Sequence, residues 1–577
     1  MAKHSSNSPR PRLLTLGLGC CLAASIGVSL GAGCATPSGA QAKGPCDDFE
    51  LDVDRIWGST QRKEVRAGMR AFAGESQLVN VDRIITKMDS LTSDWVMMNR
   101  RACKDTLERG TMPEEIYVRV SLCLNAALVQ QRTLITALGS VDRKSYEFID
   151  RAMLDISENI ATCQNQAVIA YYKVPEETKD AGAAKLADDK TAEAKTLLAL
   201  GKGDEATGLL NDAELAARRS GDERRELDAT IAVCNHKVTK GEYDRAMVYG
   251  KPALEQAQKL GYAIGEADAL ICLGTAELRQ GKHGEARKRL EAALKQREAF
   301  FGEDHPQVAD AANRLGNLES AVADYKKAHE LYMRALGVWT EAFGADDYVT
   351  SRAYHNLGFV HVGLDDIEGA VAWYQKAIEA ETKSLGTDHP ATALSEANYA
   401  SVLLLQEKVD DAYALLNHAQ EVQERILGPG HPEVAVSYHG IGQVWAARKS
   451  YESALEWYEK ALILRKLALG ERHLDTAHTL DAMATAYFKL KKYKEATDFA
   501  EQALAIREDL VGPDNILTAT SYYNLGLIYE KRKKYKDALG FYEKSLAVDE
   551  AVRGAGHVLT KQTRMAVNRL SDLVRGR

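Results

Sequence analysis

The chain has 577 residues, a formal net charge of −8 at pH 7 and a pI near 6.0. This charge repels a phosphate backbone, so nucleic acid is not expected as a partner. The motifs His-Glu-x-x-His and the phosphate loop are missing from the sequence, so no enzymatic activity, metal or cofactor is expected.

Residues 1–34 have the three parts of an export signal. A basic start precedes an apolar run that ends at Leu30, and small residues then lead to Cys34. This stretch resembles a bacterial lipobox, although Leu30 lies four residues before the cysteine and not three. We expect lipidation at Cys34, with residues 35–45 as a tether. Cleavage after Ala42 and an uncleaved anchor remain alternatives, because the apolar run has about 18 residues.

These features predict a location outside the cytoplasm. We expect the protein in the cell envelope, on the periplasmic side of an outer membrane or at the cell surface. Beyond the export segment, no apolar run in the sequence is long enough to span a bilayer. A lipid anchor is therefore the only membrane contact that we expect.

Residues 46–172 have the apolar spacing of helices and contain four cysteines. An even number of cysteines in an exported domain predicts two disulfides, for which three pairings are possible. Cys103 is expected to end one long helix and Cys123 to lie on the next, which favours a Cys103–Cys123 bond and leaves Cys46–Cys163. A metal site is not expected, because no Cys-x-x-Cys or histidine cluster accompanies these cysteines.

Residues 173–184 are expected to be a linker that limits relative motion without abolishing it. Small residues then begin to recur at intervals of 40, at Ala206, Ala246 and Ala286. Residues 185–262 are therefore predicted to form two degenerate repeats. Cys234 takes the position that a glycine holds in the next unit, so we expect a small buried residue there.

Residues 263–558 repeat with a period of 42. Glycine recurs at this interval at Gly302, Gly344, Gly386, Gly428, Gly470, Gly512 and Gly554. Within one period, apolar residues at helical spacing lie on both sides of a break, which predicts helix, turn, helix. Gly358 and Ala370 would let the two helices approach closely beside Tyr374. The fold class is thus an all-α solenoid of about nine 40–42-residue repeats, preceded by a small disulfide-linked helical domain and followed by a polar capping helix at 559–577.

Two stretches resemble known families. The segments Asn356-Leu357-Gly358, Tyr458-Glu459-Lys460-Ala461-Leu462 and Leu385-Gly386-Thr387-Asp388-His389-Pro390 resemble tetratricopeptide repeats of the kinesin-light-chain type, over about residues 263–558. Residues 46–172 resemble the extracytoplasmic region that some bacterial serine/threonine kinases carry before such an array. The glycine-rich loop, His-Arg-Asp and Asp-Phe-Gly motifs of a kinase are absent from this sequence.

The first resemblance implies where a partner would bind. In related arrays an asparagine two residues before the small residue hydrogen-bonds the backbone of an extended peptide in the concave groove. That position is held by Asn356, Asn398, Asn524 and Arg314, and the neighbouring one by His355, His439 and Tyr523. The alternative is that these asparagines only cap or bridge helices.

Two other groups of residues recur with the repeat. Histidines in the loops are expected to cap helices and not to bind metal: His305, His389, His431, His473 and His557. The lysine-rich turns at 489–494 and 531–536 are expected to be solvated, with a basic edge for anionic lipid or an acidic partner as the alternative.

Together these features predict a non-enzymatic scaffold of the bacterial cell envelope that binds a peptide or protein in the groove of the solenoid. The alternative function is a sensor or regulatory subunit that acts with a separate transmembrane serine/threonine kinase.

Overall fold

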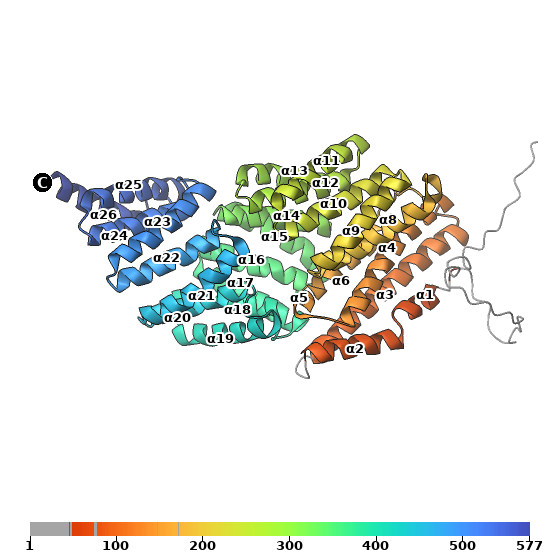
Figure 1. The fold of residues 1–577 in the computed structure, drawn as a ribbon, viewed down its shortest axis with the longest axis horizontal. Coiled ribbons are helices and arrows are strands. Elements are labelled where there is room, and N and C mark those ends of the chain that lie inside the picture. The colour runs from red at the N-terminus through yellow and green to blue at the C-terminus, as the bar shows by residue number, and fades with distance from the viewer. Residues whose placement is uncertain (1–45, 47–48, 74–77, 147, 171, 577) are drawn as a thin grey trace, which may run out of the picture.

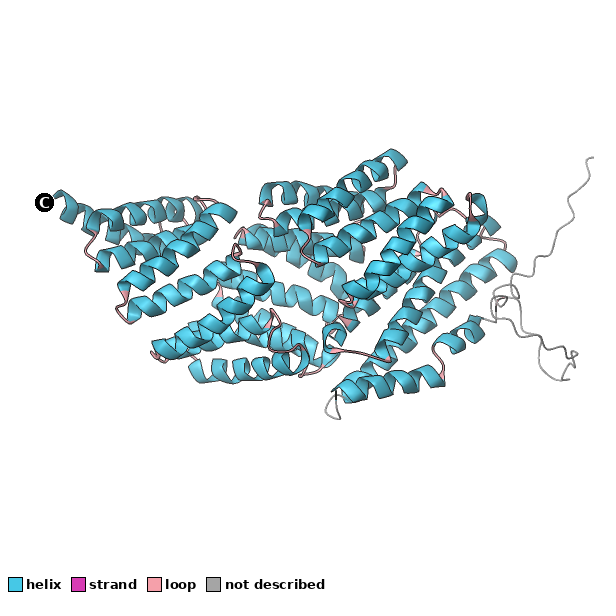
Figure 2. Ribbon diagram, viewed as in Figure 1, coloured by secondary structure: helices cyan, strands magenta, loops and turns pink. Residues whose placement is uncertain are grey.

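The computed structural model describes residues 46, 49–73, 78–146, 148–170 and 172–576. Regular secondary structure in these ranges is entirely helical (Figure 2), which confirms the all-α prediction. Within the same ranges, no helix is both long and apolar enough to cross a membrane. The predicted lipidation of Cys34 and the alternative cleavage after Ala42 lie outside the described residues.

Seven helices form the N-terminal part of the described chain. They are α1 (Phe49–Ile56), α2 (Ser59–Ala73), α3 (Leu78–Leu107), α4 (Glu114–Leu138), α5 (Arg143–Tyr146), α6 (Ile149–Thr162) and α7 (Gln166–Ile169). Helices α3, α4 and α6 pack on one another around a core that includes Met88, Leu124 and Ile156. The indole of Trp95 donates a hydrogen bond to the Leu124 carbonyl at 2.7 Å, so this buried polar group is satisfied.

The disulfides of this part join Cys46 to Cys103 and Cys123 to Cys163, with Cα atoms 5.7 Å apart in each pair. The predicted Cys103–Cys123 and Cys46–Cys163 pairings were wrong. Cys103 lies four residues before the end of α3, whereas Cys123 lies nine residues into α4. At 1.5 Å per residue these positions are roughly 6 Å and roughly 14 Å from the connecting turn, so the two side chains are not level.

A third disulfide joins Cys234 on α10 to Cys272 on α12. Cys234 is fully buried, as expected from its position, but it is bonded and not a free thiol. The bond links the first helices of two adjacent repeats and closes a loop with a sequence separation of 38 residues.

Nine successive helix pairs follow, here called repeats one to nine, each with a first and a second helix. They are α8 (Ala181–Ala199) with α9 (Gly203–Ser220), α10 (Glu223–Thr239) with α11 (Tyr243–Leu260), α12 (Ala263–Arg279) with α13 (His283–Phe301), α14 (Pro306–Ala321) with α15 (Tyr325–Phe343), α16 (Tyr348–Gly363) with α17 (Ile367–Leu385), α18 (Pro390–Leu405) with α19 (Val409–Ile426), α20 (Val434–Ala447) with α21 (Tyr451–Leu469), α22 (Leu474–Lys489) with α23 (Tyr493–Leu510), and α24 (Ile516–Lys531) with α25 (Tyr535–Val552). This arrangement confirms the predicted solenoid of about nine repeats.

Small residues allow the two helices of a repeat to pack closely. A Cβ atom added at Gly358 would lie 2.8 Å from Cγ of Tyr374, which is itself buried. No larger residue fits at Gly358 without moving the tyrosine, which is the close approach that the sequence predicts.

Loop histidines start the first helices. Gly386 follows α17 with a φ of 94°, and His389 then accepts a hydrogen bond from the Ala391 amide at 3.2 Å. Equivalent caps stand at His305, His473 and His557, and His431 accepts from the Glu433 amide at 3.3 Å. The capping interpretation is confirmed for His305, His389, His473 and His557. It is wrong for His431, because α20 begins at Val434 with Glu433 as its N-cap.

The array curves so that loops near its C-terminal end contact the turns of its middle repeats (Figure 1). Asn515, the N-cap of α24, donates to the carbonyl of Val322 in the turn of repeat four at 2.7 Å. His557 lies 2.8 Å from Asp365 in the turn of repeat five. The loops that follow repeats eight and nine therefore lie on the turns of repeats four and five.

The last helix, α26 (Val558–Arg575), packs on α25 through Ala566 and Leu570. Its other side includes apolar residues: Val558 is 63 % exposed and Met565 is 68 % exposed. The exposed surface of this helix is therefore mixed, because Lys561, Arg569 and Asp572 are exposed as well.

Candidate functional site

The predicted groove residues of repeats four to six lie along α14, α16 and α18, and Asn356, Asn398 and His355 make hydrogen bonds to polar side chains of adjacent repeats. Asn356 donates from Nδ2 to Asn313 Oδ1 at 2.9 Å, and Asn398 Nδ2 lies 3.4 Å from His355 Nε2. His355 Nδ1 lies 2.8 Å from Ser395 Oγ, and burial lowers the pKa of His355 to about 4. We call these five side chains the polar ladder. It bridges consecutive repeats, while Asn356 and Asn398 remain partly exposed.

Arg314, predicted at the same groove position as Asn356, is held by a carboxylate. Its Nε donates to Asp310 Oδ2 at 2.7 Å, and Arg297 from α13 lies 3.3 Å from the same oxygen. Burial opposes ionisation of Asp310, but Arg314 and Arg297 hold the pKa of its carboxyl below the usual value. An anionic group of a partner can reach Arg314 only in competition with Asp310.

A row of aspartates along the first helices of repeats one to four was missed in the sequence. It consists of Asp188, Asp228, Asp268 and Asp310, at spacings of 40, 40 and 42 residues. That recurrence matches the period of the small residues and could have revealed the row. Arginines neutralise it, with pairs Arg225–Asp188 at 2.8 Å, Arg224–Asp228 at 2.9 Å and Arg297–Asp268 at 3.0 Å. Among the described residues, no group of three or more His, Cys, Asp or Glu side chains could hold a metal ion.

Helix α6 of the N-terminal domain lies against the array beside the polar ladder (Figure 1). Leu154 packs against the apolar cluster of α14 to α17, which includes Ala309 and Leu357. The ring of Tyr146, at the end of α5, lies 5.7 Å from His389, the N-cap of α18. A partner that lies along the ladder would therefore also meet α6.

Carboxyl groups of α6 face charged residues of the array. Burial raises the pKa of Glu158 to about 8, and the nearby carboxylates of Asp310 and Asp155 raise it further against the opposing effect of Arg297. Burial likewise raises the pKa of Asp155. The contact between α6 and the first turns of α14 and α16 is thus favoured when these carboxyls are protonated.

Residues 265–551 match the family model of the tetratricopeptide repeat, in the overlapping segments 265–341, 330–380, 349–408, 391–462, 446–509 and 503–551. These residues are tetratricopeptide repeats. The N-terminal resemblance to a kinase extracytoplasmic region is not part of this match.

Several solved structures are similar to the chain. BtubC (BKLC) from P. vanneervenii is 18 % identical over 41 % of this chain and 92 % of its own, with a TM-score of 0.30. The putative kinesin light chain repeats of Podosopora anserina are 21 % identical over 35 % and 95 %, with a TM-score of 0.29. A Rap protein in complex with Competence and Sporulation Factor is 14 % identical over 64 % and 98 %, with a TM-score of 0.47. A comparison with curated proteins found no match.

The tetratricopeptide repeats seven to nine carry a second polar cluster, which differs from the ladder in having an unpaired member. His439 is 4 % exposed and its ring lies 4.6 Å from that of His478. Neither ring nitrogen of His439 has a hydrogen-bond partner among the described residues. Burial lowers the pKa of His439 well below its usual value and that of His478 to about 4, so both rings are neutral at pH 7.

The other predicted residues of this region lie two repeats after His439, in repeat nine. Asn524 is half-buried on α24 and lies beside Asp481, which is paired with Arg507. The ring of Tyr523 packs edge-on against Tyr542, with centroids 5.5 Å apart. His439 thus lies on α20, and Tyr523 and Asn524 lie on α24, with α22 between these two first helices. Helix α6 contacts the cluster of α14 to α17 instead.

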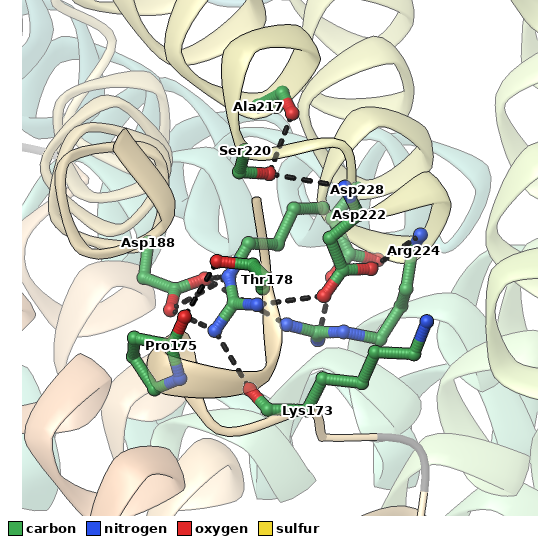
Figure 3. Close-up of polar contacts among 10 residues, drawn as sticks. Lys173, Pro175, Thr178, Asp188, Ala217, Ser220, Asp222, Arg224 and Asp228 are labelled. Carbon is green, nitrogen blue, oxygen red and sulfur yellow. Dashed lines mark hydrogen bonds and ion pairs between the residues drawn. The ribbon is translucent and has the colours of Figure 1, made fainter. Parts of the chain in front are cut away.

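The predicted linker is held by hydrogen bonds against the first helix pairs of the array. Figure 3 shows Lys173, Pro175 and Thr178 folded over the start of the array beside Asp188 and Asp222. Arg225, which is 2 % exposed, donates from Nη2 to the Lys173 carbonyl at 3.0 Å while pairing with both aspartates. The 3₁₀ turn Pro175–Glu177 fills the segment, and α8 begins at Ala181, four residues before the predicted start.

Proposed function

We propose that this protein is a non-enzymatic scaffold that binds a peptide or protein segment on the first helices of its tetratricopeptide array. The observation that carries the proposal is the unpaired imidazole of His439. Leaving a buried polar group without a partner costs about 1–3 kcal/mol, and a bound backbone would supply the missing donor and acceptor. The predicted site residues on repeats seven to nine, His439, Tyr523 and Asn524, form its core.

The polar ladder of repeats four to six extends the same surface. Asn356 and Asn398 keep exposed area that a second peptide segment could contact. Their amides already bridge neighbouring repeats, and α6 adjoins them. Partner binding on this side therefore requires rearrangement of existing hydrogen bonds, whereas binding on repeats seven to nine requires less.

We further propose that the protein acts outside the cytoplasm, anchored by a lipid on Cys34. Three disulfides support this proposal, because such bonds persist in oxidising compartments and are rare in the cytosol. The export segment of the sequence supports it independently.

The second candidate function is a sensor subunit that serves a separate transmembrane kinase. The clamped linker and the contact of α6 with α14 to α17 favour it, since both connect the disulfide-linked domain to the array. A signal received by that domain could alter the array without passing through a flexible hinge.

Site-specific photocrosslinking in cells tests the proposed site. A photoreactive amino acid at Tyr523 should give a discrete crosslinked protein, and the same amino acid at Leu215, which is 62 % exposed on the second helix α9, should not. Crosslinking from Leu215 alone would contradict binding on the first helices. A crosslinked kinase would favour the second function.

A further inference from the structure

The turns between the two helices of repeats seven, eight and nine carry an unusual concentration of positive charge. We call these turns, residues 448–450, 489–494 and 531–536, the basic edge. Their basic residues are Arg448, Lys449, Lys489, Lys491, Lys492, Lys494, Lys531, Arg532, Lys533, Lys534 and Lys536. The equivalent turns of repeats five and six carry the opposite charge, with Asp365, Asp366 and Glu407. This concentration stands out in a chain with a net charge of −8.

The lysines of the basic edge are not neutralised within the described chain. None of its nine lysines makes an ion pair with a described residue, although ion pairs are frequent elsewhere. Of its two arginines, Arg448 pairs with Asp410 at 2.7 Å and Arg532 donates to Thr497 at 2.8 Å. The lysines that flank the turns, such as Lys491 and Lys533, are exposed. The edge therefore presents a row of uncompensated charges to solvent.

The same edge of the array is already an interface earlier in the chain. In repeat four the turn carbonyl of Val322 accepts from Asn515, and in repeat five Asp365 meets His557. Both contacts come from polar loops that start a first helix. The basic edge belongs to the same row of turns, in repeats seven to nine. The loops that follow repeats eight and nine contact the turns of repeats four and five.

The surface chemistry indicates what kind of partner fits. Lys492 lies over the ring of Tyr487 at 6.0 Å, and Lys534 lies over that of Tyr529 at 5.4 Å. Both rings are partly buried in apolar clusters, so they support the lysines and are not free to insert into a bilayer. Apolar insertion is a usual part of stable attachment to a membrane surface. A polypeptide that carries carboxylates fits this surface better.

We propose that the basic edge docks an acidic segment of a protein partner. The segment would cross three consecutive turns and place its carboxylates against the lysines. This surface is separate from the proposed site at His439, Tyr523 and Asn524. An experiment can therefore contradict one proposal without contradicting the other.

The backbone conformation of three lysines of the basic edge allows their replacement by glycine without strain. Lys449, Lys491 and Lys533 have φ values of 64°, 64° and 58°. This is the left-handed region, which glycine adopts without strain. The triple variant Lys449→Gly/Lys491→Gly/Lys533→Gly removes three charges without disfavouring the fold. Glu407→Gly, at φ 61° in the turn of repeat six, is the matched control, because it makes the same backbone change and removes a negative charge.

The probe is a fluorescein-labelled oligo-glutamate peptide, titrated into the full chain and followed by fluorescence anisotropy at low and physiological salt. We expect the triple variant to bind about tenfold more weakly than the unaltered chain, since three exposed charge contacts are lost. Glu407→Gly should bind at least as well as the unaltered chain. Lys534→Glu/Lys536→Glu should weaken binding further.

Three outcomes would overturn the proposal. They are equal affinity of the triple variant and the unaltered chain, binding of phosphatidylglycerol vesicles with no binding of the peptide, and tighter binding of a single-stranded oligonucleotide than of the peptide. Circular dichroism of each variant confirms that the helices are intact.

Discussion

The imidazole of His557 lies 2.8 Å from the carboxylate of Asp365, although 192 residues separate them. One repeat earlier, Asn515 makes the corresponding contact with Val322 across 193 residues. The two contacts are spaced by one period on both sides, so they belong to one interface between the end and the middle of the array. This interface fixes the curvature, which in an open solenoid would depend on neighbouring repeats alone.

Replacing Asn515 separates its two roles. Its Oδ1 accepts from the Leu517 amide at 2.8 Å as the cap of α24, and its Nδ2 donates to Val322. Asn515→Asp keeps the cap but loses the donor, so we expect the free energy of unfolding to fall by about 1 kcal/mol. Asn515→Ala loses both and should cost about 2 kcal/mol. Urea denaturation measures both values.

The shape of the molecule gives an independent check on the same variants. Small-angle X-ray scattering should show a larger radius of gyration for Asn515→Asp combined with His557→Ala, because the interface opens. An unchanged radius, together with unchanged stability of Asn515→Asp, would mean that the closing contact contributes nothing in solution.

Disulfide connectivity is testable by mass spectrometry of the non-reduced protein. We expect peptides that join Cys46 to Cys103, Cys123 to Cys163 and Cys234 to Cys272. Cys234→Ser/Cys272→Ser should lower the stability of repeats two and three by at most about 4 kcal/mol, since the bond closes a long loop in the unfolded chain. Reduction should therefore weaken part of the array as well as the N-terminal domain. Detection of free Cys234 and Cys272 in protein purified without reductant would contradict this prediction.

The regular repeats could be predicted because their signals are local and periodic. Gly358 opposite Tyr374, Gly386 after a helix and His389 before the next lie within one 42-residue unit. The disulfide pairing could not be obtained in the same way, because it depends on how far along α3 and α4 each cysteine lies. The contact of His557 with Asp365 depends on the summed curvature of several repeats, and no single repeat specifies that curvature.

The candidate site could also be predicted from the sequence only in part. The positions of Asn356 and Asn398 on the first helices follow from the period, but their hydrogen bonds to the preceding repeat do not. The packing of Leu154 beside the ladder was also not predictable, since α6 belongs to a domain without the repeat. The aspartate row was predictable from its spacing and was overlooked.

The two ladder asparagines contribute to stability as well as to the proposed binding. Asn356→Ala/Asn398→Ala removes the bridging contacts of Asn356 with Asn313 and Asn317 and that of Asn398 with His355, so unfolding should require about 1–2 kcal/mol less. Urea denaturation measures this loss, and the yield of crosslinks from Tyr523 reports on binding. Asn568→Ala, at an exposed position of α26, is the control variant. Unchanged stability of the double variant would show that the bridging bonds are not formed in solution.

The contact between α6 and the array should weaken as pH rises above neutrality. Glu158 has its pKa raised from 4.5 to about 8, mainly by burial and then by Asp310 and Asp155. The docked state therefore binds more protons than the undocked state between these values. Docking is favoured at low pH, and its stability falls as pH rises from about 4.5 to about 8.

Glu158→Gln separates this effect from other titrations. Glutamine stays neutral, so the variant should keep α6 docked between pH 6.5 and 8.5, whereas the unaltered chain should loosen. The neighbouring His389 does not interfere in this window, because burial lowers its pKa to about 4 and it is neutral in both states above pH 6.5. Hydrogen–deuterium exchange of residues 149–162, corrected for the intrinsic rate, measures the opening. Glu114→Gln, at the exposed start of α4, is the matched control and should behave like the unaltered chain. Equal pH dependence in Glu158→Gln and the unaltered chain would show that this carboxyl does not control the docking of α6.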